Sequence, residues 1–459
     1  MNRFIIIVAF FALINSLAVA QNCSQDRREF LLREIQKANS FITDASLLEY
    51  KYQAMMESAF AFYRATNHLY YEDISQGTIS IPKTWKQNRQ VYTWLQGDFH
   101  IQNIGFLDRE KTLIFDLNDY DESYVGPFYW DLIRLLASLF LVQKAVGFSC
   151  SNSDIEELAM DFLKEYESTL KLAIGNECKL ELATSNLSGF VQKTLQHLKE
   201  NKSNKKLLKK WTKSEKNIRT FDFANSDLAK MTAEDIDEIE KFWPTYLKDI
   251  ASFYTQNPGY FKIKDKAVRL HSGLGSLGVK KYYILLEGTG ESLEDDLILE
   301  VKEERATNLL RALDSPYPSF VCESQRVKTA YQSMRKESDP HVGTLLGAKK
   351  SYFVSKISPW KYGFEPADFT SKSDMANFLK YTAQALALAH SRSDNDFHSS
   401  VVPYNFEKNA LKSIDIWPNA KTEMKELARK YSKQVEEDYK IFQDLVESGK
   451  LRDAIIRYK

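Results

Sequence analysis

Acidic and amide side chains gather in residues 96–106, a short stretch that reads QGDFHIQNIGF. Asp98 precedes Asn103 by five positions, and His100 lies between them. An acid that orients an attacking hydroxyl and an amide that helps to hold a divalent metal are two of the groups that phosphoryl transfer needs. The spacing indicates a loop that handles phosphate and metal, with Asp98 as the orienting acid and Asn103 as a metal ligand. His100 is expected to hydrogen-bond within this loop rather than to act as a base.

Three more acids, Asp116, Asp119 and Asp121, follow the next strand-like run, in LIFDLNDYDE. A hairpin of two short strands would return Asp116 to the side of Asn103, whereas the spacing to Asp131 favours Asp119. Both are candidate metal ligands, with Asp116 placed first. Carboxylate oxygens suit a hard cation, and we expect magnesium rather than calcium. Taken alone, such an acidic run is more often a solvated turn or a calcium loop, and only its position after the first loop favours catalysis.

A glycine pattern, G-x-G-x-x-G, is formed by Gly273, Gly275 and Gly278, with Ser276 inside it. A dinucleotide-binding loop would require a helix to open at Gly278. The residues that follow, VKKYYILLEG, are strand-like instead. The pattern therefore favours a glycine hairpin that covers the phosphates of a nucleotide, with these four residues contacting it.

Lys302 lies in the middle of the strand-like segment LILEVKEE, where an ordinary surface lysine would not be expected. A lysine on a strand after a glycine hairpin is typical of a group that binds nucleotide phosphates. Its expected carboxylate partner is Glu323, at the start of a following helix, with Glu303 and Glu304 as alternatives. An exposed helix face is the competing interpretation of Glu323.

Hydrophobic periodicity changes several times along the chain. Residues 24–82 repeat apolar positions at three and four, as helices do, and residues 91–116 shorten to strand-like runs. Short β-like runs return after Asn257-Pro258-Gly259 and give way to helices after Pro359. The predicted regions are a signal peptide (1–20), an N-terminal helical segment (21–90), a catalytic-loop and helical region (91–256), a β-rich nucleotide-binding region (257–360) and C-terminal helices that complete the helical lobe (361–459).

The composition limits the class of partner. With 62 basic and 62 acidic residues, the net charge gives no reason to expect nucleic acid. Residues 1–20 place Arg3 ahead of an apolar run that ends in Ala20, the pattern of a secretory signal peptide, with an uncleaved membrane anchor as the alternative. We expect a protein exported to the periplasm or secreted, without stable membrane insertion after the signal is cleaved.

Five segments together resemble a family of uncharacterised bacterial proteins, domain of unknown function 2252 (DUF2252). They read GDFHIQNIGF, FDLNDYDESYVGPFYWDLIRLLASL, GLGSLG, EVKEE and LALAHSRSD, and the resemblance runs from about Arg27 to Asp396. That family is related to the protein kinase-like and aminoglycoside phosphotransferase-like fold. The resemblance therefore implies an α+β protein with a two-lobed protein kinase-like fold and extra N- and C-terminal helices.

The order of the motifs differs from that of a kinase, in which the glycine loop and lysine precede the catalytic loop and metal acid. Here the catalytic-loop residues come first. A circular permutation would explain this order, because joining about Asp394 back to about Val91 restores the usual sequence of elements. Permutation is tolerated where the break points lie at the surface. In this interpretation Asp131 anchors the catalytic loop by hydrogen bonds to its backbone.

The function we expect is an ATP- and magnesium-dependent phosphotransferase, with ATP and Mg²⁺ as cofactors and an unidentified small-molecule or protein acceptor. Lys302 would bind the nucleotide phosphates beneath the glycine loop. One alternative is a non-catalytic kinase-like binding protein of the cell envelope, because exported proteins meet little ATP. Another is a nucleotidyl transferase that uses the same cleft.

Overall fold

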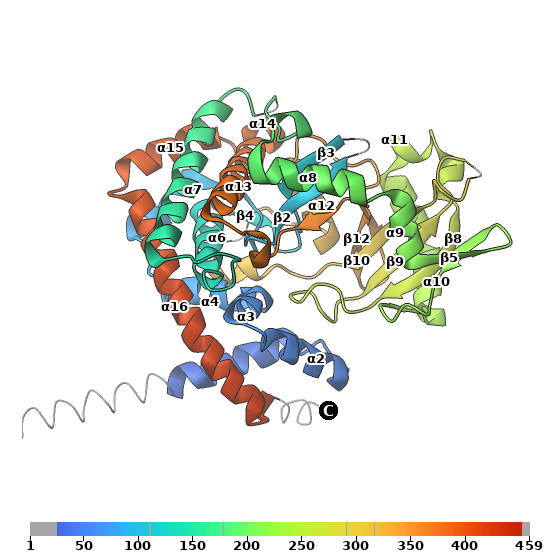
Figure 1. Ribbon diagram of the computed structural model, residues 1–459, viewed down its shortest axis with the longest axis horizontal. Helices are drawn as coiled ribbons and strands as arrows, with labels where there is room; N and C mark the ends of the chain where they lie inside the picture. Colours follow the sequence, from blue (N-terminus) through green and yellow to red (C-terminus); the bar gives the residue numbers. More distant parts are fainter. Residues whose placement is uncertain (1–24, 110–111, 178, 291, 316, 452–459) are drawn as a thin grey trace, which may run out of the picture.

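The computed structural model describes residues 25–109, 112–177, 179–290, 292–315 and 317–451. In this part of the chain, a helical lobe and a lobe built on an antiparallel sheet lie side by side (Figure 1). The expected α+β class is therefore confirmed. The predicted signal peptide, residues 1–20, lies outside the described residues.

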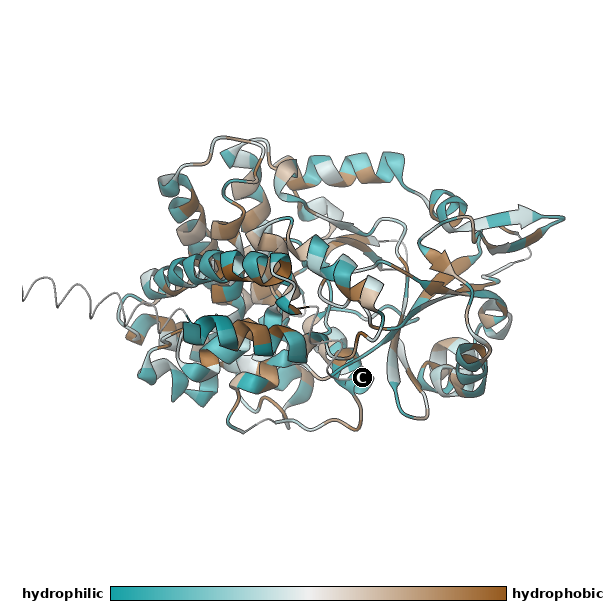
Figure 2. Ribbon diagram, turned by 90° about the horizontal axis from the view of Figure 1, so that it is seen from below, coloured by the Kyte–Doolittle hydropathy of each residue, from teal (hydrophilic) through white to brown (hydrophobic). Residues whose placement is uncertain are grey.

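The sheet lobe is built on a six-stranded antiparallel sheet with the strand order β11-β12-β10-β9-β8-β7. Side chains alternate between its faces, as the period of a strand requires. Tyr282 and Ile284 pack in one apolar cluster, whereas Tyr283 and Leu285 pack in a second. Figure 2 accordingly shows hydrophobic residues along the central strands. The strands are β7 (Leu228–Ala229), β8 (Ile263–Arg269), β9 (Lys281–Leu286), β10 (Leu297–Glu303), β11 (Gly343–Leu346) and β12 (Ser351–Lys356).

Helices cover this sheet on both faces. Helix α10 contributes Ile239 and Trp243 to the first cluster, and α9 contributes Leu208 and Trp211 to the second. Both helices precede residue 257, so the sequence pattern groups them with the helical region. In the structure, however, they pack on the sheet. The elements here are α9 (Asn204–Trp211), β5 (Thr212–Glu215), β6 (Ile218–Phe221), α10 (Ala233–Asp249), α11 (Ala251–Tyr254), η3 (Pro258–Phe261) and η4 (Asn308–Ala312).

Helix α12 (Glu323–Met334) connects the two lobes. It follows β10 in the chain and precedes β11, and it packs on β12 of the sheet. It also packs against α13 (Lys372–Arg392), a helix of the helical lobe. The position of α12 therefore fixes how the sheet meets the helices.

The helical lobe is organised around α6 and α13. Helix α6 is buried from Tyr129 to Leu139, so other elements must surround it, and α16, α7 and α3 (Ala59–Ala65) do so. Among the described residues, no helix combines the length and the apolar character needed to cross a membrane. The remaining helices of this lobe are α6 (Tyr129–Leu141), α7 (Asn152–Ala173), η2 (Thr184–Asn186), α8 (Gly189–Asn201), η5 (Pro366–Asp368), α14 (Asn395–His398), α15 (Phe406–Ile416) and α16 (Ala420–Glu447).

Two small antiparallel sheets within the helical lobe hold the acidic loops. In one, β2 and β3 form a hairpin whose register pairs Gly105 with Asp116. In the other, β1 pairs with β4, and β1 ends at Leu95, directly before the predicted catalytic loop. The strands are β1 (Tyr92–Leu95), β2 (Ile104–Arg109), β3 (Thr112–Leu117), β4 (Tyr124–Pro127) and β13 (Tyr362–Gly363).

The N-terminal helices lie beside α16, at the far end of the chain (Figure 1). Arg27 pairs with Asp73 at 2.6 Å and donates from Nε to Asp438 at 2.9 Å, so the two ends of the described chain are tied together. Residues 25–39 are helical and are followed by α2 (Ala45–Met55), α3 (Ala59–Ala65), α4 (Asn67–Gln76), α5 (Lys83–Lys86) and η1 (Arg89–Val91).

Candidate active site

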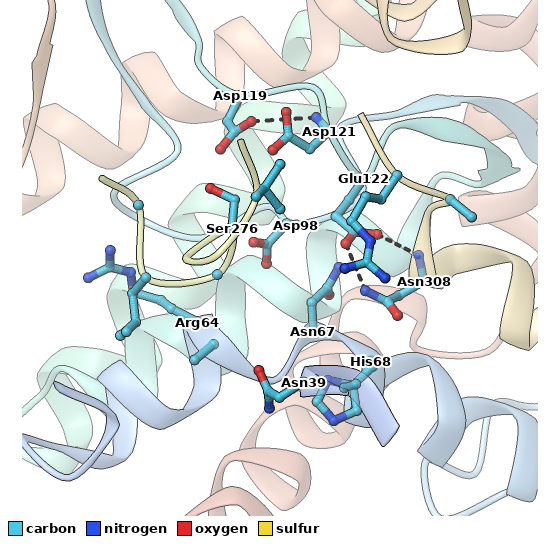
Figure 3. Close-up of a pocket in the computed structure, with 18 of the residues that line it drawn as sticks. Asn39, Arg64, Asn67, His68, Asp98, Asp119, Asp121, Glu122, Ser276 and Asn308 are labelled. Atoms are coloured by element: carbon cyan, nitrogen blue, oxygen red, sulfur yellow. Dashed lines mark hydrogen bonds between the residues drawn. The ribbon is translucent and has the colours of Figure 1, made fainter. Parts of the chain in front are cut away.

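A cavity of about 420 Å³ lies where the two lobes and the N-terminal helices meet. Its lining includes Asp98, Asn103 and Asp119 from the helical lobe. The glycine-rich segment from the sheet lobe lines it as well, including Ser276 (Figure 3). Tertiary structure thus brings together two groups of residues that lie far apart in the sequence and that were predicted to share a site.

The loop that carries Asp98 is held by its backbone. Asp131, on α6, accepts from the backbone N–H of Gln96 at 2.7 Å and from that of Gly97 at 3.0 Å. Its carboxylate also lies 3.3 Å from Nε2 of His390, whose other ring nitrogen contacts Tyr166 OH at 2.7 Å. The predicted anchoring of this loop by Asp131 is present, and the three hydrogen-bonded side chains of Asp131, His390 and Tyr166 are all buried.

The carboxylate of Asp98 is fixed by a buried arginine. Nε of Arg134 donates to Oδ1 of Asp98 at 2.8 Å, and a second guanidinium nitrogen contacts the same oxygen. Burial raises the pKa of the Asp98 carboxyl to about 7, although Arg134 acts in the opposite direction. A carboxyl group with such a pKa can both accept and release a proton near neutral pH.

Asn103 and His100 complete the loop. Asn103 donates from Nδ2 to the backbone carbonyl of Asp98 at 2.8 Å, which turns its amide toward the base of the loop and leaves Oδ1 as an acceptor. Nδ1 of His100 accepts from the backbone N–H of Gln102 at 3.3 Å, as expected for a residue with a structural role. Burial keeps the pKa of His100 well below its usual range, so its ring is neutral.

Lys302 and the acids after β3 meet in the structure. Nζ of Lys302 lies 3.4 Å from Oδ1 of Asp119 and contacts the carboxylate of Asp121 more closely. Burial opposes ionisation of Asp119, yet Lys302 holds its pKa below the usual range. Burial and the nearby charge of Asp119 raise the pKa of Asp121 to about 7. The two carboxyls therefore lose their protons in different pH ranges although they share one lysine.

Asp116 lies apart from this group. It is paired with Gly105 in the β2–β3 hairpin, and its Oδ1 accepts from the backbone N–H of Leu117 at 2.9 Å. It is not among the residues that line the cavity. The structure therefore places Asp119, and not Asp116, beside Lys302.

Glu323 also lies apart from Lys302. As the first residue of α12, it accepts from Nε of Arg326, one turn further on, at 2.7 Å. Arg326 in turn donates to the backbone carbonyls of Ser123 and Asp121. The carboxylates that Lys302 contacts thus come from the loop after β3, and the expected partner on the helix is engaged by an arginine.

The glycine pattern forms the turn of the β8–β9 hairpin. Gly273 and Gly278 have φ values of +73° and +94°, which side chains rarely adopt. A Cβ on Gly278 would lie 2.6 Å from Ile42. Lys281 supports the turn from inside, donating to Ser272 O at 2.8 Å and to Ser276 Oγ at 2.9 Å. The hairpin is therefore held close to the cavity that it lines.

Several cavity residues could not be identified from motifs. Glu122 accepts from the backbone N–H of Asn308 at 2.6 Å and from its side chain at 2.7 Å, which ties the acidic loop to the sheet lobe. The N-terminal helices contribute Lys51, Arg64 and Asn67. The only sequence signal for Arg134 is a charged residue within the apolar run YWDLIRLLASL, one turn after Asp131.

Several side chains that line the cavity offer oxygen atoms as metal ligands, as a magnesium site requires. Asp119 and Asn103 line the same space and offer a carboxylate and an amide oxygen. Within the described ranges, no group of three or more His, Cys, Asp and Glu side chains is arranged to hold a metal ion. A magnesium ion here would therefore need oxygen ligands from phosphates and water, which is its usual mode of binding in nucleotide sites.

Comparison with protein families confirms the resemblance found in the sequence. The family described as "Uncharacterized protein conserved in bacteria (DUF2252)" matches residues 43–445. Neither the curated proteins nor the solved structures give a match. Because the family match covers most of the chain, the chain belongs to DUF2252.

Proposed function

We propose that this member of the DUF2252 family is an ATP- and magnesium-dependent phosphotransferase. The observation that carries the proposal is the contact of Lys302 with Asp119 and Asp121, two acids that line the same cavity as Asp98 and the glycine hairpin. An orienting acid, a metal acid, a phosphate-binding lysine and a loop of backbone N–H groups are the parts that phosphoryl transfer requires.

The arrangement of the sheet lobe supports a kinase-like fold. The glycine hairpin joins β8 and β9, and Lys302 lies on β10, the third strand of the series. Helix α12 follows β10 in the chain, after the short helical turn η4. Protein kinases likewise place a glycine-rich loop first, the lysine on the third strand and a helix after it.

A spatial contact supports the proposed circular permutation. Thr93, in β1, donates from its hydroxyl to the backbone carbonyl of His390, near the end of α13, at 2.8 Å. The same hydroxyl lies 3.1 Å from the hydroxyl of Ser393. The end of α13 and the start of the segment leading to Asp98 are therefore neighbours in space, as a permuted order requires.

Each side chain then has a distinct role. The acceptor oxygen forms a bond to the terminal phosphorus of ATP, the bond from that phosphorus to the bridging oxygen breaks with its electron pair leaving on ADP, and the hydroxyl proton passes to Asp98. Asn103 and Asp119 would hold magnesium, which neutralises phosphate charge when bound. Lys302 and the backbone N–H groups of the hairpin from Gly273 to Gly278 would hold the phosphates.

The charges of the cavity fit this division. Lys302 lies between one carboxyl that stays ionised and one whose pKa is raised to about 7, so this end of the site is close to neutral. Asp98, at the base of the same cavity, is paired with Arg134. A nucleotide with its metal would thus meet pre-positioned charges of both signs.

A binding experiment tests the proposal before any acceptor is known. A ligand that binds the native state raises the unfolding midpoint. We expect ATP to raise the midpoint of the purified protein in the presence of magnesium, and much less when EDTA is added. Lys302→Met should abolish the shift, whereas Lys86→Met, at an exposed position on α5, should retain it. If ATP with magnesium leaves the wild-type midpoint unchanged, the proposal fails.

The products of slow turnover separate the proposal from its rivals. Phosphotransfer, to water if no better acceptor is present, releases ADP. Nucleotidyl transfer would release pyrophosphate instead. Binding without release of either product would indicate a binding protein, although the contact of Lys302 with Asp119, which lines the same cavity as Asp98, favours catalysis.

A further inference from the structure

The N-terminal helices form one wall of the cavity, although none of the expected phosphotransfer motifs lies in them. Lys51 of α2, Arg64 of α3, and Asn67 and His68 of α4 all line the cavity. Asn67 donates to the backbone carbonyl of Gly97, next to Asp98, at 3.2 Å. These helices therefore contact the loop that carries the proposed base.

Lys51 is a buried cation in this wall. Its exposed fraction is 2%, and Nζ donates to the backbone carbonyl of Gly275 in the glycine hairpin at 3.3 Å. Within the described ranges of the chain, Lys51 forms no ion pair with a carboxylate. Burial lowers the pKa of Lys51 to about 8, and the nearby Arg305 acts in the same direction. A buried ammonium without an acid costs stability, so a bound anion would compensate it.

Two neighbouring groups are similarly unsatisfied. Nε of Arg64 and Nε2 of His68 are buried and have no hydrogen-bond partner in the described structure. Burial lowers the pKa of His68 to about 3, so its ring is neutral and can donate from one nitrogen without adding charge. Arg64, like Lys51, forms no ion pair with a carboxylate among the described residues, although the charges of Glu365, Asp98 and Glu57 partly offset the effect of burial on its pKa. Buried donors left unpaired in a cavity are expected to receive a ligand.

This wall lies away from the metal acids. In Figure 3, Asp98 is drawn between the pair Asp119–Asp121 on one side and Asn39 and His68 on the other. The nucleotide and its metal would be held at the first side, by Lys302 and Asp119. The second side is therefore where the molecule that approaches Asp98 from the opposite direction would lie.

We propose that the acceptor of the phosphotransferase is a small hydroxyl compound that carries its own oxyanion, a phosphate or a carboxylate, bound by Lys51 and Arg64. This inference rests on the proposed function. The anion would occupy the donors of the N-terminal wall and place the hydroxyl at Asp98. Two cations and a neutral imidazole donor favour an oxyanion over a neutral sugar or an amine, since an ammonium group would be repelled.

Inorganic phosphate is the probe for this site. Calorimetric titration of phosphate into the full-length protein, saturated with magnesium and a non-hydrolysable ATP analogue, should show binding that is weakened about tenfold or more in Lys51→Met and in Arg64→Gln. Lys51→Arg keeps the charge and should retain most of the affinity. Lys86→Met is the matched control outside the cavity and should bind as the wild type does. Repeating the titration with acetate distinguishes a carboxylate from a phosphate preference.

The pH dependence gives an independent readout. In the part of the chain that the structure describes, Arg305 and His68 are the charged or titratable groups that act on Lys51, and neither loses charge between pH 7 and 9.5. Phosphate affinity of the wild type should therefore fall as pH rises through about 8, where Lys51 loses its proton. Lys51→Arg should remove this fall.

The outcomes separate the two proposals. If the ATP analogue binds but phosphate does not, or binds equally to wild type, Lys51→Met and Arg64→Gln, the phosphotransferase stands and the anionic acceptor is overturned. If both substitutions abolish binding of the analogue itself, the two cations serve the nucleotide, and the acceptor inference is again overturned. If the wild type binds no nucleotide, the proposed function fails whatever phosphate does.

Discussion

Arg134 and Asp98 form a partly buried ion pair in which Nε of the arginine donates to Oδ1 of the carboxylate at 2.8 Å. Arg134 lies one turn after Asp131 on α6, and residues three apart on a helix share a face. One turn of one helix thus fixes the backbone of the loop through Asp131 and its carboxylate through Arg134. Both arginine contacts use Oδ1, whereas Oδ2 lies 3.7 Å from Nε2 of His100, beyond hydrogen-bond distance.

Replacing Asp98 by Asn should separate catalysis from binding. The substitution keeps the volume but removes the negative charge that orients the hydroxyl and accepts its proton. We expect ADP release to fall by a factor on the order of hundreds, as for loss of a general base. Affinity for ATP with magnesium should barely change, because the phosphates are held by Lys302 and the glycine hairpin. Loss of nucleotide binding in Asp98→Asn would show that the assigned role is wrong.

Two aspartates allow a matched test of the metal site. Asp119→Asn should weaken nucleotide binding in the presence of magnesium and leave the weaker binding in EDTA unchanged, since only the metal-dependent part is lost. Asp116→Asn, outside the cavity, should leave both unchanged. Calorimetric titration of ATP with and without magnesium measures each value. If Asp116→Asn weakens magnesium-dependent binding of ATP more than Asp119→Asn does, the metal ligand is Asp116 in the β2–β3 hairpin.

Arg134 should act as a positioning residue, and a pH profile reveals it. Burial raises the pKa of Asp98 to about 7 against the effect of Arg134, so the rate of ATP hydrolysis should rise with pH through about 7 as Asp98 loses its proton. In Arg134→Met the opposing charge is gone, and the rise should move to higher pH. A variant that lowers the rate equally at every pH, with the midpoint unmoved, would indicate a structural role alone.

Removing the charge of Lys51 should stabilise the unliganded protein. Its pKa is lowered from 10.5 to about 8, so the unfolded chain holds the proton more tightly than the native state does. Wild-type stability therefore gains with pH between about 8 and 10.5, and Lys51→Met lacks this gain. At pH 7 the variant should be more stable by up to about 3 kcal/mol, a difference that shrinks as pH rises. Urea unfolding at pH 7 and 10 measures it.

Equal destabilisation of Lys51→Met at both pH values would mean that the lysine supports the glycine hairpin through Gly275 and little more. Lys86→Met, at an exposed position, should change stability by a few tenths of a kcal/mol at most. Natural proteins commonly retain destabilising groups at sites of function. The comparison therefore tests whether Lys51 is kept for a ligand.

Local structural features, such as loops and hairpins, were predicted well from the sequence. The spacing of Asp98 and Asn103 and the strand-like residues after Gly278 are short-range signals, and the structure shows a loop and a hairpin at these positions. The backbone hydrogen bonds of Asp131 were also expected and are present. Such features depend on turn chemistry and on residues a few positions apart.

The pairing of Lys302 was harder to predict. The sequence pattern favoured Glu323, yet Arg326 engages that carboxylate one helical turn later. Asp119, which contacts Lys302, adopts a φ of +58°, a backbone conformation that is uncommon for a residue with a side chain. The spacing of motifs in the sequence predicts neither which side chains of α12 face Lys302 nor a left-handed backbone conformation in a loop. The wall formed by the N-terminal helices was missed for the same reason, since it is a purely tertiary contact.

The contact between Thr93 and His390 has a consequence for synthesis. The two residues are 297 positions apart, so the ribosome must release nearly the whole chain before α13 can close on β1. Until then the loop that carries Asp98 lacks the His390 contact to its Asp131 anchor, and the apolar α6 lacks α16, one of the helices that cover it. Contacts of such long range slow folding and favour completion of the helical lobe as one late event. The nascent protein should therefore remain without an assembled site for most of its translation.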